Sequence, residues 1–234
     1  MKKQKQNLKV IILLGPPGSG KGTQAILLAE KFNLYYLETS KLLEKVFSNP
    51  SGKEFVEVNG RKYYLKEERK LWETGKLCSP PFVFSLVKKK IKEIFEEKKG
   101  IVFAGSPRTL EEAKKMMPFL EELYAKSNIK IFYLDLSMEQ SVWRNSHRRI
   151  CKLMRHPILY TEETAKLTFC PLDGSELMKR TLDKPEIVEK RFKVYQEQTL
   201  PLFGYLEKEG FKIQKINGKP PVADVFKDIL KSLQ

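Results

Sequence analysis

The chain has 234 residues and a net charge of +15 at pH 7; 41% of its residues are hydrophobic and 31% are charged. This length suits one large α/β domain with small insertions, no apolar run approaches the ~20 residues of a membrane span, and three cysteines do not support a disulfide framework. The positive charge favours polyanionic partners, but the lysines are scattered along helical patterns and no aromatic-rich motif of the RNA-binding kind is present. We therefore expect nucleotides as partners, and neither nucleic acid nor a membrane.

The N-terminal residues, Met1–Asn7, are basic and precede a short apolar run, Val10–Leu14. A secretory signal with these features would end in a cleavage site at the end of the run. Cleavage there would destroy the glycine-rich loop that follows, so we expect a cytoplasmic protein.

The most informative segment is this glycine-rich loop, which leads into the helical pattern Gln24–Lys31. Strand, glycine loop and helix are the context of a phosphate-binding loop, because the glycines let backbone N–H groups face phosphate oxygens at a helix N-terminus. Lys21 would reach the β- and γ-phosphates of ATP. A turn that only caps a helix does not need three glycines, a lysine and this preceding strand. The expected ATP contacts are Gly15, Pro17, Gly18, Ser19, Gly20, Lys21, Gly22 and Thr23.

Apolar, β-branched runs alternate with helical patterns along the whole chain. This alternation predicts a parallel five-stranded sheet flanked by helices, an α/β fold of the phosphate-loop NTPase kind, with ligands at the carboxyl ends of the strands. The predicted strands are Lys9–Leu14, Leu34–Leu37, Ile101–Ala104, Ile129–Leu136 and Phe211–Ile216. The predicted helices are Gly20–Phe32, Ser40–Phe47, Lys66–Thr74, Pro81–Lys98, Leu110–Ala125, Met138–Arg149, Lys184–Glu209 and Val222–Ser232.

Two stretches interrupt the alternation and are predicted to be insertions into this core. Asn49–Lys66 contains two short β-patterns around the turn Asn59-Gly60, which predicts a hairpin. Cys151–Arg180 is loop-rich and contains two of the cysteines.

Several arginines stand where a phosphate-loop kinase needs them. Such an enzyme neutralises the charge on the transferring phosphoryl group, and arginine is always charged and shaped for bidentate phosphate contacts. Arg108 follows a predicted strand, and Arg144 and Arg148 are four residues apart on a predicted helix, hence on one face. Arg180 and Arg191 follow the second insertion. We expect these arginines to bracket the insertion that folds over ATP.

Together these features resemble the long, lid-containing type of adenylate kinase, from Lys9 to nearly the C-terminus. The loop ending Lys21-Gly22-Thr23 is similar to that family's loop. Four arginines have the family's spacing: Arg144, Arg148, Arg180 and Arg191. Gly105-Ser106-Pro107-Arg108-Thr109 resembles the family's Gly-Phe-Pro-Arg-Thr, and Gly75-Lys76-Leu77-Cys78 resembles its AMP-contacting Gly-Lys-Leu-Val. The resemblance implies a monomeric enzyme that transfers a phosphoryl group from ATP, bound with Mg²⁺, to a nucleoside monophosphate.

The resemblance also implies how the chain is divided. The core would comprise residues 1–38, 100–150 and 181–234. A monophosphate-binding region would cover 39–99, with an extra hairpin at 54–66, and a lid would cover 151–180. The implied catalytic residues are Lys21, Arg108, Arg144, Arg148, Arg180 and Arg191, with Arg144 and Arg148 also on ATP. The implied monophosphate contacts are Thr39, Lys76, Leu77, Cys78, Gly105, Arg108, Glu112, Arg180 and Arg191.

Three residues depart from the family pattern. Glu44 stands where the family has the arginine that grips the AMP phosphate, and Lys41 or Lys45 could compensate for it. Ala104 replaces the aspartate that organises magnesium-bound water, and Glu112 stands at the glutamine that reads adenine. These departures leave two alternatives open: an ATP-binding protein with weak activity, or a kinase for a different monophosphate.

The lid resembles the zinc lids of the family with one ligand missing. Cys151, Cys170 and Asp173 match three ligand positions, but Met154 occupies the remaining one, and a thioether is a poor zinc ligand. His156 could replace it from two residues further on. We expect no metal, and a lid packed around Met154 and Phe169.

Overall fold

The computed structural model describes residues 9–48 and 54–233. The core is a five-stranded parallel sheet in the order β10-β6-β1-β5-β2, which confirms the predicted α/β fold. Residues Met1–Asn7 and the start of the first predicted insertion, 49–53, lie outside the described residues. The strands of the sheet are β1 (Val10–Leu14), β2 (Tyr35–Glu38), β5 (Ile101–Ala104), β6 (Ile129–Asp135) and β10 (Ile213–Asn217).

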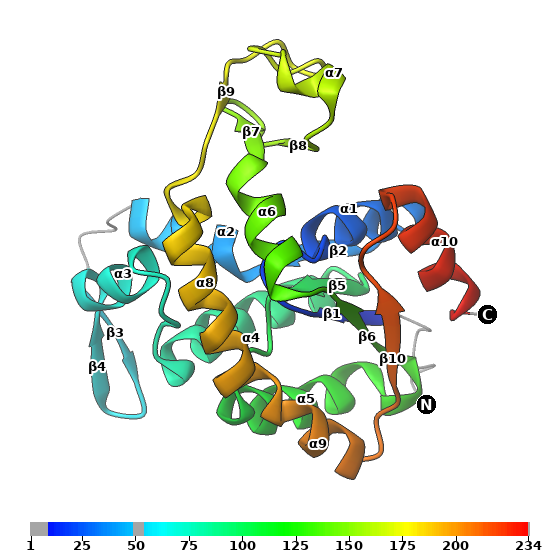
Figure 1. Ribbon diagram of the computed structural model, residues 1–234. Helices are drawn as coiled ribbons and strands as arrows, with labels where there is room; N and C mark the ends of the chain where they lie inside the picture. Colours follow the sequence, from blue (N-terminus) through cyan, green and yellow to red (C-terminus); the bar gives the residue numbers. More distant parts are fainter. Residues whose placement is uncertain (1–8, 49–53, 234) are drawn as a thin grey trace.

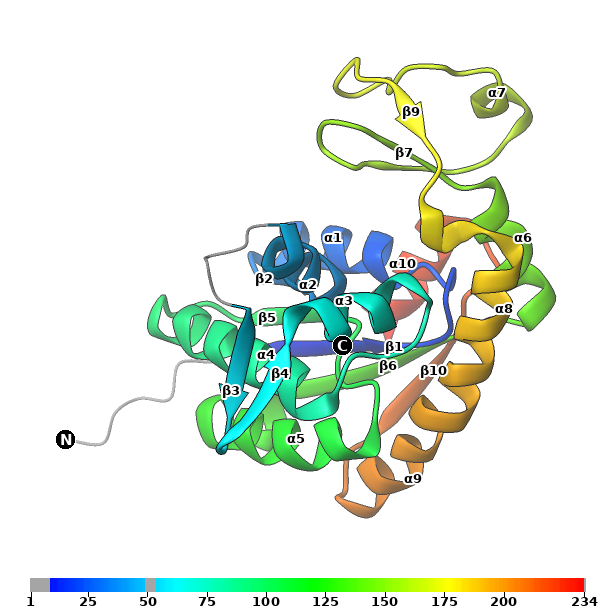
Figure 2. The same cartoon turned by 90° about the vertical axis from the view of Figure 1, so that its left-hand side faces the viewer.

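Helices cover both faces of this sheet, as Figure 2 shows edge-on. One face packs against α1 (Lys21–Phe32) and α10 (Val222–Lys231), and the other against α4 (Pro80–Glu96), α5 (Leu110–Tyr124) and α9 (Pro201–Lys208). All of β1 is buried because alternate residues enter the two apolar cores. This double cover leaves the strand ends as the place where ligands can enter.

The first insertion is longer than the predicted Asn49–Lys66, because it begins directly after the edge strand β2 and ends with α3. It contains α2 (Thr39–Ser48), the antiparallel pair β3 (Phe55–Val58) and β4 (Arg61–Tyr64), and α3 (Leu65–Glu73). The predicted hairpin turn is present, with positive φ angles of 52° at Asn59 and 77° at Gly60. The buried ring of Tyr63 stacks near Phe82 and fixes the hairpin on α4.

The second insertion stands above the sheet as a separate small layer (Figure 1). It contains β7 (Arg149–Cys151), β8 (Pro157–Ile158), α7 (Glu162–Ala165) and β9 (Leu177–Met178), and β7 pairs with both other strands. The chain enters it from α6 (Met138–His147) and leaves through a short turn, η2 (Thr181–Asp183), into α8 (Pro185–Val194).

Two helix predictions need correction, one in regularity and one in extent. The predicted helix Lys184–Glu209 is helical from Pro185 to Lys208, but it is made of α8, a wider π-helical turn η3 (Tyr195–Thr199) and α9. The wider turn precedes Pro201, which has no N–H to donate to the helix. The predicted helix Met138–Arg149 ends at His147. Arg148 has an extended backbone, so it does not share a helical face with Arg144.

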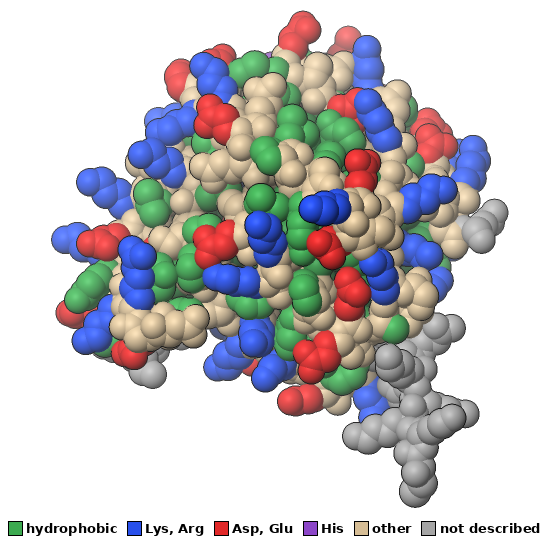
Figure 3. Space-filling view, turned by 90° about the horizontal axis from the view of Figure 1, so that it is seen from below, with side chains coloured by type: hydrophobic (Ala, Val, Ile, Leu, Met, Phe, Trp, Pro, Cys, Tyr) green, Lys and Arg blue, Asp and Glu red, His purple; other side chains and the backbone are tan. Residues whose placement is uncertain are grey.

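Two observations bear on the surface. In the described part of the chain, no helix combines the length and apolar character that crossing a membrane requires. On the face seen in Figure 3, lysine and arginine side chains are interspersed with acidic and hydrophobic ones.

Candidate active site

A cavity of about 620 Å³ opens at the carboxyl ends of the strands. The phosphate loop, the ends of β2 and β5, the helix α2 and the segment before α4 line it from the core side, and α6, α8 and the second insertion line it from above. The ends of β1, β2 and β5, the segment after β10 and both insertions therefore line one space, as expected for a ligand site in this class of fold.

The phosphate loop forms one wall of this cavity. Gly15 has a φ of 145°, and a side chain there would place its Cβ 2.5 Å from the carbonyl oxygen of Leu134, so only glycine fits. Lys21 is the first residue of α1, and its Nζ donates to the carbonyl oxygens of Gly15 and Pro16 at 2.7 Å each. All the loop residues predicted to contact ATP line the cavity: Gly15, Pro17, Gly18, Ser19, Gly20, Lys21, Gly22 and Thr23.

Arginines from different elements converge opposite the loop. Arg108 Nε donates to the carbonyl oxygen of Gly105 at 2.7 Å, and Arg191 Nη1 donates to that of Leu182 at 3.2 Å. Arg148 forms a two-pronged ion pair with the buried Asp183, at 2.9 Å and 2.5 Å. These anchors hold the guanidinium groups at the cavity wall.

Burial and the positive charges gathered around this cavity lower the pKa values of basic side chains in its wall. Burial lowers the pKa of Lys21 well below its ordinary value, and the charges of Arg108, Arg191 and Arg148 lower it further. Burial and neighbouring arginines also lower the pKa of Arg191 to about 9. Like charges this close repel one another, so the site favours a ligand with several negative charges.

Arg144 is held differently from the other arginines. Its Nη1 and Nη2 donate to the carbonyl oxygens of Gly218 and Lys219, at 2.8 Å and 2.9 Å, in the segment that follows β10. It still lines the cavity. The structure thus brings together all six residues predicted to be catalytic: Lys21, Arg108, Arg144, Arg148, Arg180 and Arg191.

Three of the predicted monophosphate contacts do not line the cavity. Thr39 is buried and donates to the hydroxyl of Ser106 at 2.9 Å, and Cys78 is buried against the carbonyl oxygen of Glu68. The buried Glu112 accepts the backbone N–H of Arg108 at 2.8 Å. The remaining predicted contacts do line it: Lys76, Leu77, Gly105, Arg108, Arg180 and Arg191.

Glu44 is neutralised by residues other than the two expected from sequence. Its carboxylate accepts from Arg155 Nη2 at 3.1 Å and lies 3.7 Å from Arg180 Nη2. Lys41 instead lies 3.7 Å from Glu38. Because Arg155 belongs to the second insertion, this contact joins the two insertions across the mouth of the cavity.

A model of one family, described as adenylate kinase, matches residues 13–211. The chain belongs to the adenylate kinase family. It is 34% identical to the adenylate kinase of Methanothrix thermoacetophila over 95% of this chain and 97% of that protein. It is 32% identical to that of Petrotoga mobilis (96% and 97%), and 33% identical to adenylate kinase 2 of Schistosoma mansoni (94% and 86%). These matches confirm the resemblance seen in the sequence, and they make the chain a nucleoside monophosphate kinase.

Sequence reasoning missed several residues of this family member's site. Arg155 and Asp183 contact the site only through long-range pairing, and nothing in their local sequence indicates it. Glu38 could have been found, because it ends a strand at the edge where ligands bind. Tyr36, two residues before it, donates its hydroxyl to Glu38 at 2.6 Å.

The second insertion carries four metal-binding groups close together. The ligand atoms of Cys151, His156, Cys170 and Asp173 all lie within 4.8 Å of one another. His156 Nδ1 is 3.5 Å from Cys151 Sγ, 3.6 Å from Cys170 Sγ and 3.2 Å from the Asp173 carboxylate. His156 follows the expected ligand position, Met154, by two residues, and its imidazole nevertheless lies within the cluster.

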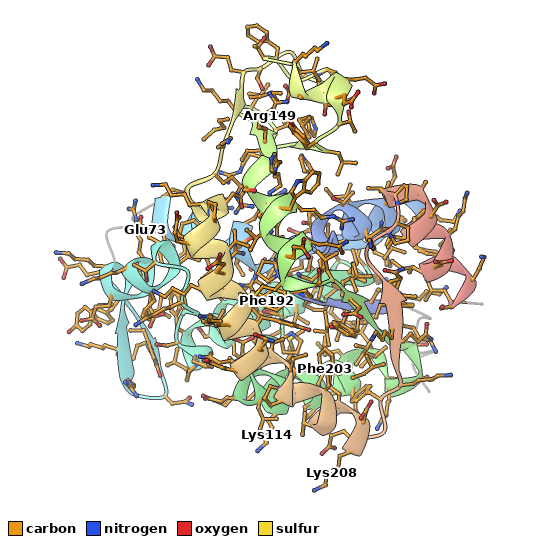
Figure 4. All side chains as sticks on the ribbon, in the orientation of Figure 1. Glu73, Lys114, Arg149, Phe192, Phe203 and Lys208 are labelled. Atoms are coloured by element: carbon orange, nitrogen blue, oxygen red, sulfur yellow. The ribbon has the colours of Figure 1, made fainter. Side chains whose placement is uncertain are left out.

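The expectation that this insertion packs around Met154 and Phe169 was wrong. These side chains are 61% and 56% exposed, and the buried core comprises Cys151, Ile158 and Cys170. Arg149, at the stem of the insertion above α6 (Figure 4), donates to carbonyl oxygens of α7 and the residues after it.

Proposed function

We propose that this chain catalyses the reversible reaction ATP + AMP = 2 ADP. The observation that carries the proposal is one cavity lined both by the phosphate loop and by Arg108, Arg144, Arg148, Arg180 and Arg191. Such a site can hold two phosphate chains end to end and neutralise the charge on the phosphoryl group between them. No general base is required, because the acceptor phosphate is already a nucleophile at neutral pH.

In this proposal the two substrates occupy opposite ends of the cavity. Lys21 and the loop amides hold the phosphates of ATP, with Arg144 and Arg148 beside them. Arg108, Arg180 and Arg191 meet the acceptor phosphate and the phosphoryl group in transfer. Mg²⁺ enters as part of the ATP substrate, where it neutralises charge on the β- and γ-phosphates.

We also propose the division of labour among the parts of the chain. Residues 151–180 act as a lid and residues 39–99 as a monophosphate-binding region on the core of 1–38, 100–150 and 181–234. The contact of Arg155 with Glu44, which links α2 to the second insertion, supports closure of the two parts toward each other. Closure excludes water, which would otherwise accept the phosphoryl group.

We further infer that the lid holds a structural zinc ion, in place of the metal-free lid expected from sequence. Two thiolates, an imidazole and a carboxylate, supplied by Cys151, His156, Cys170 and Asp173, form a four-ligand set of the kind that zinc takes in tetrahedral sites. The ion would cross-link the two ends of the lid and supply no chemistry to the transfer.

The acceptor is tested by an ADP-forming assay with ATP, Mg²⁺ and each of AMP, CMP, UMP and GMP. We expect the largest kcat/KM with AMP. A larger value with another monophosphate would assign a different acceptor. If the chain binds ATP but turns over none of the four monophosphates, the alternative of an ATP-binding protein with weak activity is favoured instead.

A further inference from the structure

The acidic side chains that line the cavity, within the described residues, are Glu38 and Glu44. Mg²⁺ prefers oxygen ligands, keeps several waters, and is bound in such sites through one or two carboxylates together with the substrate phosphates. Glu44 is already engaged by Arg155 and Arg180. Glu38 is therefore the carboxylate left to meet a magnesium-bound nucleotide.

Glu38 lies at the right edge of the sheet for this role. It is the last residue of β2 and pairs in register with Ala104, the last residue of β5. Side chains two residues apart on a strand share a face, and Tyr36 packs on the core beside α1. Glu38 is thus on the face of the sheet where α1 begins at Lys21.

The contacts of Glu38 orient its carboxylate and leave part of its hydrogen-bond acceptor capacity unused. One oxygen accepts the Tyr36 hydroxyl at 2.6 Å and the other accepts the Ser40 hydroxyl at 2.7 Å, while Lys41 lies 3.7 Å away. A carboxylate has about four lone-pair sites, so acceptor capacity remains. The Tyr36 hydroxyl lies 3.2 Å from the point where a Gly22 Cβ would stand, which places this pair against the phosphate loop.

The carboxylate is charged in this setting. Burial alone would raise the pKa of Glu38, but the hydroxyl hydrogen bonds from Tyr36 and Ser40, then the charges of Lys41 and Arg180, hold it below the ordinary value. The charge of Glu38 also acts on Lys21, the lysine of the phosphate loop.

We propose that Glu38 holds the water shell of ATP-bound Mg²⁺, from the strand next to Ala104, whose methyl group offers no ligand atom. The proposal rests on the proposed function, because it takes Mg²⁺-ATP as the substrate. It makes Glu38 a positioning residue, which orients the metal's waters and through them the β- and γ-phosphates.

The test is calorimetric ATP binding with Mg²⁺ and with EDTA, for the wild-type chain and Glu38→Gln. Glutamine keeps an acceptor for Tyr36 but loses the charge. Loss of a residue that orients the ligands of a metal typically costs 10- to 100-fold in metal affinity, so we expect Mg²⁺ to improve ATP binding about 10-fold less in the variant. ATP affinity in EDTA should be unchanged or higher. Glu44→Gln, the matched change at the other carboxylate, should keep the full magnesium effect.

A second substitution tests the position of the carboxylate. Ala104→Asp, added to Glu38→Gln, should restore the magnesium effect, because it returns a carboxylate to the same face one strand away. If Glu38→Gln prevents folding, Glu38→Asp, which keeps the charge but draws the carboxylate back by one methylene, should also weaken the magnesium effect. An unchanged magnesium effect in Glu38→Gln, or in Glu38→Asp where Glu38→Gln does not fold, overturns the proposal. A wild-type chain that binds no ATP under either condition contradicts the proposed function instead.

Discussion

At the scale of single residues, Lys21 is the test of the phosphate loop. Lys21→Ala removes a charge from the place where negative charge develops in the transition state, and loss of one such donor costs about 10²–10³ in rate. We expect a fall of that size in kcat for ADP formation. Lys31→Ala, an exposed lysine at the end of the same helix, is the control. Near-normal turnover of a folded Lys21→Ala variant would contradict the assignment of this loop as the binding site for the ATP phosphates.

Glu44 competes with the acceptor phosphate for cationic partners. Its carboxylate lies 3.7 Å from Arg180 and accepts from Arg155. Glu44→Gln should free Arg180 for the phosphate and tighten AMP binding. A fully solvent-exposed ion pair is worth about 0.2–1 kcal/mol, or about 1.4- to 5-fold in Kd. Arg180 and Glu44 are only 18% and 20% exposed, so we expect the Kd for AMP to fall by at least this much. Calorimetry measures it, with the exposed hairpin change Glu57→Gln as control. Weaker AMP binding would contradict this, and would show that the loss of the Arg155 contact between the two parts outweighs the release of Arg180.

The buried Glu112 predicts a pH dependence of stability. Burial raises the pKa of Glu112 to about 7, although the hydrogen bond from the Arg108 N–H and the charge of its guanidinium act to lower it. A carboxyl group with a raised folded-state pKa binds its proton more tightly when folded. Its contribution is therefore complete below about pH 4.5 and is lost as pH rises through about 7.

Denaturant unfolding at several pH values measures this effect. Glu112→Gln should remove a fall of on the order of 3 kcal/mol in the free energy of unfolding between about pH 4.5 and 7. Glu111→Gln, at the exposed neighbouring position, should keep the fall. The same slope in both variants would mean that Glu112 does not titrate in this range.

At the scale of elements, the proposed zinc site makes the stability of the second insertion depend on metal. Its buried apolar core is small, because Met154 and Phe169 are exposed. A zinc ion on the cluster would supply the missing stability, since a structural site contributes directly to folding. Metal analysis of the purified chain should find about one zinc per chain. A strong chelator should lower the melting temperature.

Two lid variants distinguish this site from adventitious zinc. His156→Ala should abolish the bound zinc, because His156 Nδ1 faces both cysteine sulfurs. Met154→Ala, an exposed residue two positions earlier, should retain it. If the purified chain contains no zinc and the chelator leaves its melting temperature unchanged, the zinc proposal is wrong. The four side chains would then form a hydrogen-bonded cluster without metal.

At the scale of the whole molecule, the sequence predicted most of the architecture and only part of the site. The strands could be predicted because a parallel sheet covered on both faces requires continuous apolar runs such as Val10–Leu14. Local patterns could not predict the wider helical turn before Pro201 or the extended backbone of Arg148, because both depend on how the chain packs against the rest of the fold.

The same limit applies to charge pairs in the site. The partners of Glu44 and Arg148 are 111 and 35 residues away in sequence, so neither pair leaves a local signal. The loop residues were predictable because their function depends on adjacent glycines and a lysine. Thr39, Cys78 and Glu112 were assigned by resemblance alone, and the structure places them behind the cavity wall.

The central claim is that one cavity binds ATP and AMP together and passes a phosphoryl group directly between them. The most direct measurement is ³¹P NMR of the chain with ATP, AMP and Mg²⁺. We expect ATP and AMP to disappear in equal amounts and two ADP to appear for each pair, without inorganic phosphate. Loss of ATP with release of inorganic phosphate and unchanged AMP would contradict it, because water rather than the monophosphate would then be the acceptor.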